Sequence, residues 1–103
     1  MLKTKGVTQT STLDLHGAFV RRTDLSGASL RGANMSKVDA TNASFRDADF
    51  EGAVLDETIL RGADLTGAKN LTLEQLSSAV IDSETILPTY IDKNKLRLSP
   101  VGK

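Results

Sequence analysis

Residues 13–67 read LDLHG AFVRR TDLSG ASLRG ANMSK VDATN ASFRD ADFEG AVLDE TILRG ADLTG, and this stretch decides the fold. It repeats every five residues without a break: a usually small residue, a mostly polar residue, a large apolar residue and two further residues. The large apolar residue is called the centre of its unit, and only the unit of Ala40 lacks one. The centres are Leu15, Val20, Leu25, Leu30, Met35, Phe45, Phe50, Leu55, Leu60 and Leu65.

A constant period of five matches neither the 3.6-residue period of a helix nor the two-residue period of a strand. Self-similarity at a short fixed period is typical of a solenoid, in which each unit buries its apolar face on the next. The small residue and the centre are two positions apart, so a short extended segment points both inward and the residue between them outward. The remaining two residues turn a corner, and Gly is frequent at the second of them, where backbone freedom is most useful.

The unit Ala63-Asp64-Leu65-Thr66-Gly67 resembles the A-[D/N]-L-x-x repeat of the pentapeptide-repeat family. The resemblance covers residues 13–70, and members of this family are especially abundant in cyanobacteria. It implies an all-β solenoid: a right-handed, quadrilateral β-helix with four units per coil, and therefore about three coils for this stretch. Four-sided closure is an implication of the resemblance, because the period of five does not by itself define it.

If a coil takes twenty residues, the centres stack in columns, for example Leu15 below Met35 and Leu55. The unit of Ala40 lacks a large centre but carries Val38 where its neighbours carry Ala. We interpret this as a local exchange of volume within a close-packed interior.

The segments on either side of the repeat lack its pattern. Residues 1–12 are polar and leave two alternatives open, an edge strand that covers the first coil or a disordered leader. Residues 71–88 are predicted to form a cap with a short helix at 72–80, because Thr72 and Gln75 fit a capping box and Leu73, Leu76 and Val80 share a helical face. Residues 89–103 are mildly basic and are predicted to form a flexible tail.

Composition excludes several classes of function. The chain has 103 residues, which suit one domain, and 13 acidic side chains balance 13 Lys and Arg. This balance gives no electrostatic reason to expect nucleic-acid or membrane binding. The absence of Cys excludes disulfides and thiolate metal sites. We see no signal peptide or membrane-spanning segment, and we therefore expect a cytoplasmic protein.

No group of residues predicts catalysis or a cofactor site. His16 is the only histidine and has no Cys or second His to complete a metal site. The regularly spaced aspartates differ from calcium-binding β-roll repeats, which use a nine-residue unit. We therefore expect a non-enzymatic protein with no cofactor, no metal and no small-molecule substrate.

Three apolar residues occupy outward positions that are otherwise mostly polar: Phe19, Val54 and Ile59. They form the candidate partner-binding surface, because exposed apolar area marks interaction sites. The alternative is that residues 80–87 fold over Val54 and Ile59 and cover them. Phe19 lies too far from that end of the repeat to be covered in the same way.

The sequence thus predicts a structural or protein–protein interaction module whose partner is another protein or a second copy. The alternative function is mimicry of DNA to inhibit or protect DNA gyrase, as some pentapeptide-repeat proteins do. Residues 13–70 carry nine acidic and seven basic side chains, a net charge of −2. DNA presents one charge per roughly 1.7 Å, so about three coils at roughly 4.8 Å each would have to display on the order of eight. Charge and length both disfavour mimicry.

Overall fold

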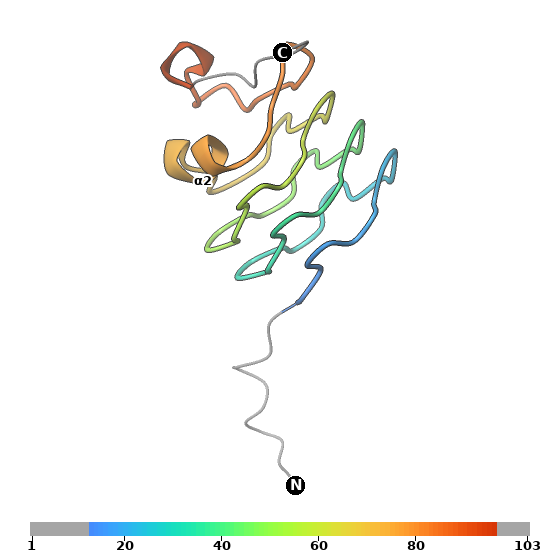
Figure 1. Cartoon of the computed structure of the whole chain (residues 1–103). Coiled ribbons are helices and arrows are strands. Elements are labelled where there is room, and N and C mark those ends of the chain that lie inside the picture. Colours follow the sequence, from blue (N-terminus) through green and yellow to red (C-terminus); the bar gives the residue numbers. More distant parts are fainter. Residues whose placement is uncertain (1–12, 97–103) are drawn as a thin grey trace, which may run out of the picture.

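The computed structural model describes residues 13–96, whose backbone winds in stacked turns (Figure 1). Parallel β-bridges join residues twenty positions apart, such as Asp14 with Asn34 and Asn34 with Val54. Each outward residue of the repeat forms such a bridge, and the described chain contains no longer strand. Four five-residue units therefore complete one turn, as the family resemblance implied.

The bridges define four faces, named A to D in chain order. Each face is a column of outward residues, one from each successive turn. Face A carries Asp14, Asn34 and Val54, face B carries Phe19, Asp39, Ile59 and Val80, face C carries Asp24, Ser44, Asp64 and Ile86, and face D carries Ser29, Asp49 and Lys69.

The corners between faces share one conformation. The N–H of the next small residue donates to the carbonyl of the preceding centre, as from Ala18 to Leu15 at 2.8 Å. The second corner residue has a positive φ, from 57° at Arg22 to 75° at Gly27. This geometry is that of a type II turn, which explains why Gly recurs there. Residues such as Lys37 and Glu57 adopt the same conformation with a side chain attached.

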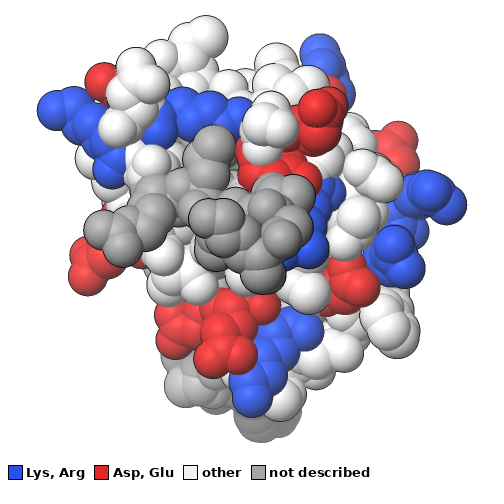
Figure 2. Space-filling model, turned by 45° about the horizontal axis from the view of Figure 1, so that its top comes forward, with Lys and Arg blue, Asp and Glu red and all other residues white. Residues whose placement is uncertain are grey.

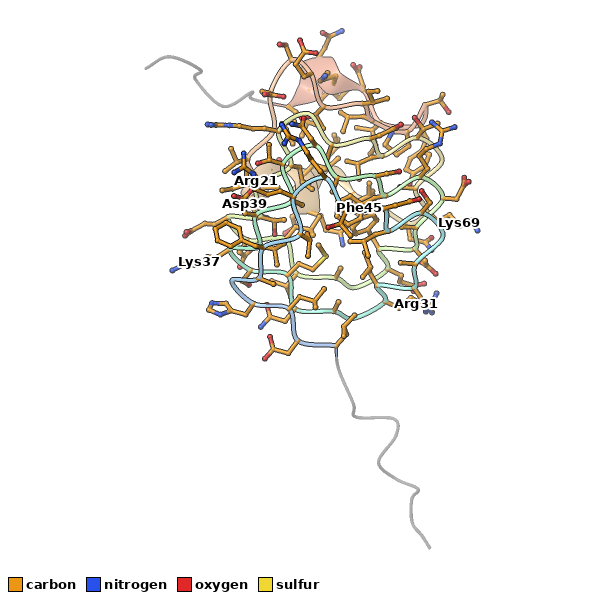
Figure 3. The ribbon with its side chains drawn as sticks, turned by 90° about the vertical axis from the view of Figure 1, so that its right-hand side faces the viewer. Arg21, Arg31, Lys37, Asp39, Phe45 and Lys69 are labelled. Atoms are coloured by element: carbon orange, nitrogen blue, oxygen red, sulfur yellow. The ribbon has the colours of Figure 1, made fainter. Side chains whose placement is uncertain are left out.

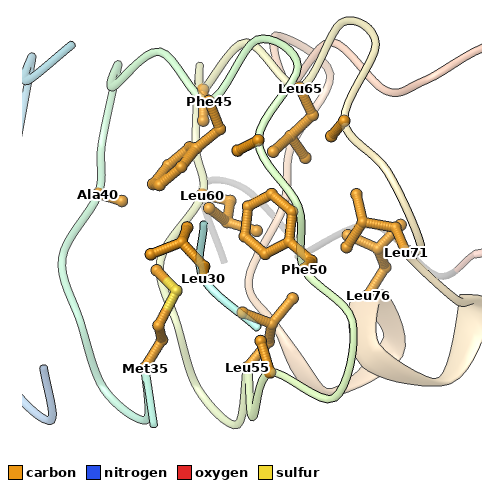
Figure 4. Packing of buried hydrophobic residues seen from close by; sticks show 14 of the residues in the cluster. Leu30, Met35, Ala40, Phe45, Phe50, Leu55, Leu60, Leu65, Leu71 and Leu76 are labelled. Atoms are coloured by element: carbon orange, nitrogen blue, oxygen red, sulfur yellow. The ribbon is translucent and has the colours of Figure 1, made fainter. Parts of the chain in front are cut away.

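The interior is filled by the centres and the small residues (Figure 4). The rings of Phe45 and Phe50, on neighbouring faces, have centroids 5.5 Å apart and planes tilted by 57°. Val38 and Ala40 are both fully buried, as the predicted exchange of volume requires. Thr58 is also buried at a small-residue position, and its hydroxyl donates to the Met35 carbonyl at 2.6 Å.

Helix α2, Leu73–Ser78, lies over one end of the stack (Figure 1). Its N-cap is Thr72, and the predicted capping box with Gln75 is present. Two details of the sequence prediction are wrong. The helix ends at Ser78, and of the three apolar residues expected to face the coil Leu76 is buried whereas Leu73 is 37% exposed. Val80 lies beyond the helix and bridges Ile59 on face B.

After α2 the chain resumes the winding of the repeat. Val80 bridges Ile59 and Ile86 bridges Asp64, so the predicted cap is a helix followed by a partial turn of the solenoid. Residues 89–96, predicted to belong to a flexible tail, are instead part of this cap. They include the short helix η2, Lys93–Lys95, and buried Leu96. The alternatives for residues 1–12 and the prediction for 97–103 lie outside the described residues.

Candidate interaction surface

Chemistry-bearing side chains are dispersed over the described part of the molecule. Among residues 13–96, no group of three or more His, Asp or Glu side chains could hold a metal ion. Every buried side-chain nitrogen and oxygen in that range has a hydrogen-bond partner. His16 is exposed on the corner between faces A and B. No helix of residues 13–96 has the length and apolar character needed to cross a bilayer.

The charged side chains of the faces form a regular diagonal pattern. A corner Arg in one turn reaches an Asp eighteen residues later, on the face directly above it. Arg31 lies 3.0 Å from Asp49, Arg46 lies 3.0 Å from Asp64, and Arg21 lies 3.8 Å from Asp39. Figure 2 shows acidic and basic side chains intermixed at the end of the molecule that is turned toward the viewer. These three aspartates are thus paired with arginines of the same chain.

Asp49 on face D has the most strongly perturbed carboxyl group of this pattern. The amide of Asn70 donates to it at 2.9 Å, Arg31 donates at 3.0 Å and the Glu51 N–H donates at 3.1 Å. These hydrogen bonds, with that of Asn70 the largest cause and that of Arg31 the next, lower the pKa of Asp49 to about 2. The Thr41 hydroxyl likewise lowers the pKa of Asp39 on face B.

Phe19 is the most exposed large apolar side chain of the described residues, at 78%. It points outward, as the sequence predicted, and lies on face B in the first described turn, where it bridges Asp39 above it. Figure 3 shows Arg21, Lys37 and Asp39 along this side of the stack, with Arg31 and Lys69 on the opposite side. Phe19 is therefore an exposed aromatic ring next to the ion pair of Arg21 and Asp39.

Val54 and Ile59 differ from Phe19 and from each other. Val80 bridges Ile59: it donates to the Thr58 carbonyl and accepts from the Leu60 N–H, both at 2.8 Å. The segment after α2 therefore does fold against Ile59. Val54 on face A has no such neighbour and is 41% exposed beside α2. The structure therefore does not gather the three sequence-predicted residues into one patch.

Two hollows open to solvent lie between α2 and the turn beneath it. They have volumes of about 460 and 380 Å³, and Ala53 and Gln75 line both of them. Gln75 donates from Nε2 to the carbonyls of Phe50 and Ala53, both at 2.9 Å. Its Oε1 accepts from the Thr72 N–H at 2.9 Å. The Gln75 amide thus joins α2 to the repeat through both of its N–H donors and caps the helix through its oxygen.

Sequence reasoning missed the residues that close this end of the solenoid. The Tyr90 hydroxyl donates to the Ala68 carbonyl at 2.6 Å and accepts from the Leu71 N–H at 3.1 Å. The Thr85 hydroxyl donates to the Leu60 carbonyl at 2.8 Å. One signal was present: Ala79-Val80-Ile81 and Thr85-Ile86-Leu87 keep the order of small, outward and large residues. Nothing in the sequence pattern marks Tyr90.

Comparison with known proteins agrees with this geometry. A family model described as pentapeptide repeats matches residues 13–47 and 33–69, with 8 copies. No curated protein matches the chain significantly.

Three solved structures are similar to the described fold. Rfr23, a pentapeptide repeat protein from the cyanobacterium Cyanothece 51142, is 32% identical over 75% of this chain, with a TM-score of 0.66. HetL from Nostoc sp. strain PCC 7120, a pentapeptide repeat protein involved in heterocyst differentiation regulation, is 31% identical over 71%, with a TM-score of 0.54. A pentapeptide repeat protein of the Arabidopsis thaliana thylakoid lumen is 32% identical over 85%, with a TM-score of 0.55. The chain spans 52%, 36% and 66% of the lengths of these proteins.

Proposed function

Because the chain belongs to the pentapeptide-repeat family, we propose that it is a non-enzymatic scaffold that binds another protein. Its body is a right-handed quadrilateral β-helix of about three coils. Members of this family are generally non-catalytic scaffolds, and among residues 13–96 no group of His, Asp and Glu side chains could hold a metal ion. Cytoplasmic residence stays a prediction.

The exposure of Phe19 is the observation that carries this proposal. A phenyl ring that is 78% exposed contributes little to the stability of the fold, because most of its apolar area stays in water. A partner that buries the ring would remove this area from water. Asp39 bridges Phe19 from the turn above and lies 3.8 Å from Arg21, so a partner would need an apolar pocket with polar groups of both signs at its edge. Val54 and Ile59 contribute less, because Ile59 is half-buried by Val80 and Val54 faces away on face A.

Affinity capture from the source cells, followed by quantitative mass spectrometry, tests the proposal. We expect Phe19→Asp to lose a protein that the wild type retains. Ile86→Asp is the matched control, because Ile86 is an outward apolar residue, 51% exposed, at the other end of the solenoid. Identical sets of proteins from all three baits would contradict a binding role for Phe19.

The alternative of DNA mimicry gains no support from the surface. A mimic needs unpaired acidic groups in a regular array, whereas Asp39, Asp49 and Asp64 each pair with an Arg of the turn below. We expect no effect on gyrase supercoiling at protein concentrations that saturate the scaffold's own partner.

A further inference from the structure

The two ends of the solenoid differ in how their backbone is paired. The lower end is the turn formed by residues 13–32, and the upper end is the one covered by α2 and residues 79–96 (Figure 1). In the lower turn the outward residues use neither their N–H nor their C=O in any hydrogen bond among residues 13–96. These four residues are Asp14, Phe19, Asp24 and Ser29.

The apolar interior is also open at the lower end. Leu15, Val20 and Leu25 are only partly buried, whereas Met35 and Phe45, directly above Leu15 and Leu25, are fully buried. Leu13 is 49% exposed. The lower end thus combines an apolar centre with a rim of unpaired backbone groups, which is a template for pairing with another chain.

The segment that precedes the lower end does not have the sequence of another turn. Continued in phase, the repeat would place Lys5 and Thr10 at centre positions and Lys3 and Thr8 at small-residue positions. In a coil of twenty residues Lys5 would lie beneath Leu25 and Thr10 beneath Leu30, and neither supplies the large apolar side chain that Phe45 and Phe50 supply in the turn above. A second lower end does supply apolar side chains, because it presents its own Leu15, Val20 and Leu25.

We propose that the lower end binds the lower end of a second copy, the two copies being related by a two-fold axis. The axis is perpendicular to the long axis of the solenoid, so the facing segments of the two copies run antiparallel.

In an antiparallel hydrogen-bonded pair each residue uses both its N–H and its C=O to bond the residue opposite. The four outward residues of the lower turn have these two groups free within the described chain. The upper end is covered, so the association closes at two copies and does not extend into a fibre. The pairing goes beyond the scaffold function proposed above and does not depend on it.

Amide hydrogen exchange of the full chain, measured at two protein concentrations, tests the pairing. We expect the amides of the four outward residues of the lower turn to exchange slowly at high concentration and rapidly on dilution. Light scattering should give the mass of two copies in the first condition and of one in the second. Slow exchange at the mass of one copy would show that the chain covers its own lower end. Rapid exchange at high concentration would show that this end stays open. Either result overturns the proposal.

A pair of substitutions locates the interface. Leu13→Lys places a charge from each copy at the proposed contact, and we expect the dissociation constant of the pair to rise by at least roughly tenfold. Leu73→Lys is the matched control, because Leu73 is also partly exposed, at 37%, but lies on α2 at the upper end. Circular dichroism checks that both variants fold. Equal effects of the two substitutions, or an effect of Leu73→Lys alone, would overturn the assignment to the lower end.

Discussion

At the upper end of the solenoid, backbone groups that the repeat leaves free find partners within residues 75–90. Leu60 and Leu65 donate to carbonyls of Val80 and Ile86, and the side chains of Gln75 and Tyr90 reach other groups of the same turn. At the lower end, the described chain offers no such partners. The comparison teaches that five-residue units pair the backbone of neighbouring turns but leave backbone groups of the outermost turns unpaired. Completion needs residues outside the repeat, because the outermost turn has no neighbour to bond.

Removing the upper cap should produce the largest effect. We expect a chain that stops after Asn70 to aggregate or to form end-to-end oligomers, because both of its ends would then present unpaired backbone. A chain that stops after Leu96 should behave like the full chain, since Tyr90 and buried Leu96 complete the cap. Light scattering compares the two. A monodisperse, folded chain ending at Asn70 would show that the cap is dispensable.

The next largest effect should come from replacing leucines of one interior column with alanine, measured as the loss in the free energy of unfolding. Leu55 is 1% exposed, and Leu55→Ala should lower the free energy of unfolding by about 2–5 kcal/mol. Leu15 is partly buried at the lower end, so Leu15→Ala should cost less in dilute solution. Chemical denaturation measures both. If the lower ends pair, the cost of Leu15→Ala increases with protein concentration. Equal costs at low concentration would contradict the difference between the ends.

Gln75→Glu tests the closure of the upper end by a side chain. The substitution keeps the acceptor for the Thr72 N–H but removes the donors to the Phe50 and Ala53 carbonyls. We expect a loss of about 1–3 kcal/mol in the free energy of unfolding, because two carbonyls then face a carboxylate. Glu74→Gln, on the exposed side of the same helical turn, is the control and should change little. Equal denaturation midpoints for the two variants would show that Gln75 does not hold α2 to the repeat.

The smallest effect should come from Asp49, in the middle of the stack, and should appear in the stability of the fold at acidic pH. The pKa of Asp49 is about 2 in the folded chain, below its ordinary value of 3.8. The carboxylate therefore contributes stability that is present above about pH 4 and is lost as the pH falls toward 2. Asp49→Asn should make the denaturation midpoint depend less on pH between about 2 and 4. The slope of the midpoint against pH should stay unchanged near neutral pH. An unchanged slope would indicate that other groups, such as Asp39 or Asp64, dominate the window.

Much of the repeat could be predicted from the sequence, for a local reason. Every unit carries its own small residue, outward residue and centre, so the period places Asp49 outward and Phe50 inward without knowledge of distant contacts. The same locality predicted the capping box of Thr72 and Gln75. It failed at Val80, which shares a helical phase with Leu76 but was drawn into a bridge with Ile59. A tertiary hydrogen bond decided there against the local pattern.

The candidate surface could be predicted only in part. Each of Phe19, Val54 and Ile59 was recognisable because it breaks the rule that outward residues are polar. How exposed each of them is could not be predicted, because the exposure of Val54 and Ile59 depends on where residues 79–87 lie after the helix. Tyr90 was invisible as a functional part of the cap, since its hydroxyl bonds to residues 68 and 71, far away in sequence.

The sequence by itself determined the period, the inward and outward sides of each unit, the family and the balance of charge, because each of these is written within single units. The tertiary structure alone decided which residues finish the stack. The backbone N–H and C=O groups of a terminal turn need hydrogen-bond partners, and the stacking of twenty-residue turns fixes where those groups lie. Their partners are the residues that the tertiary structure brings close, whatever their distance in sequence. Gln75, Thr85 and Tyr90 do so at the upper end, whereas the lower end of the described chain keeps an open apolar interior and a rim of unpaired backbone groups.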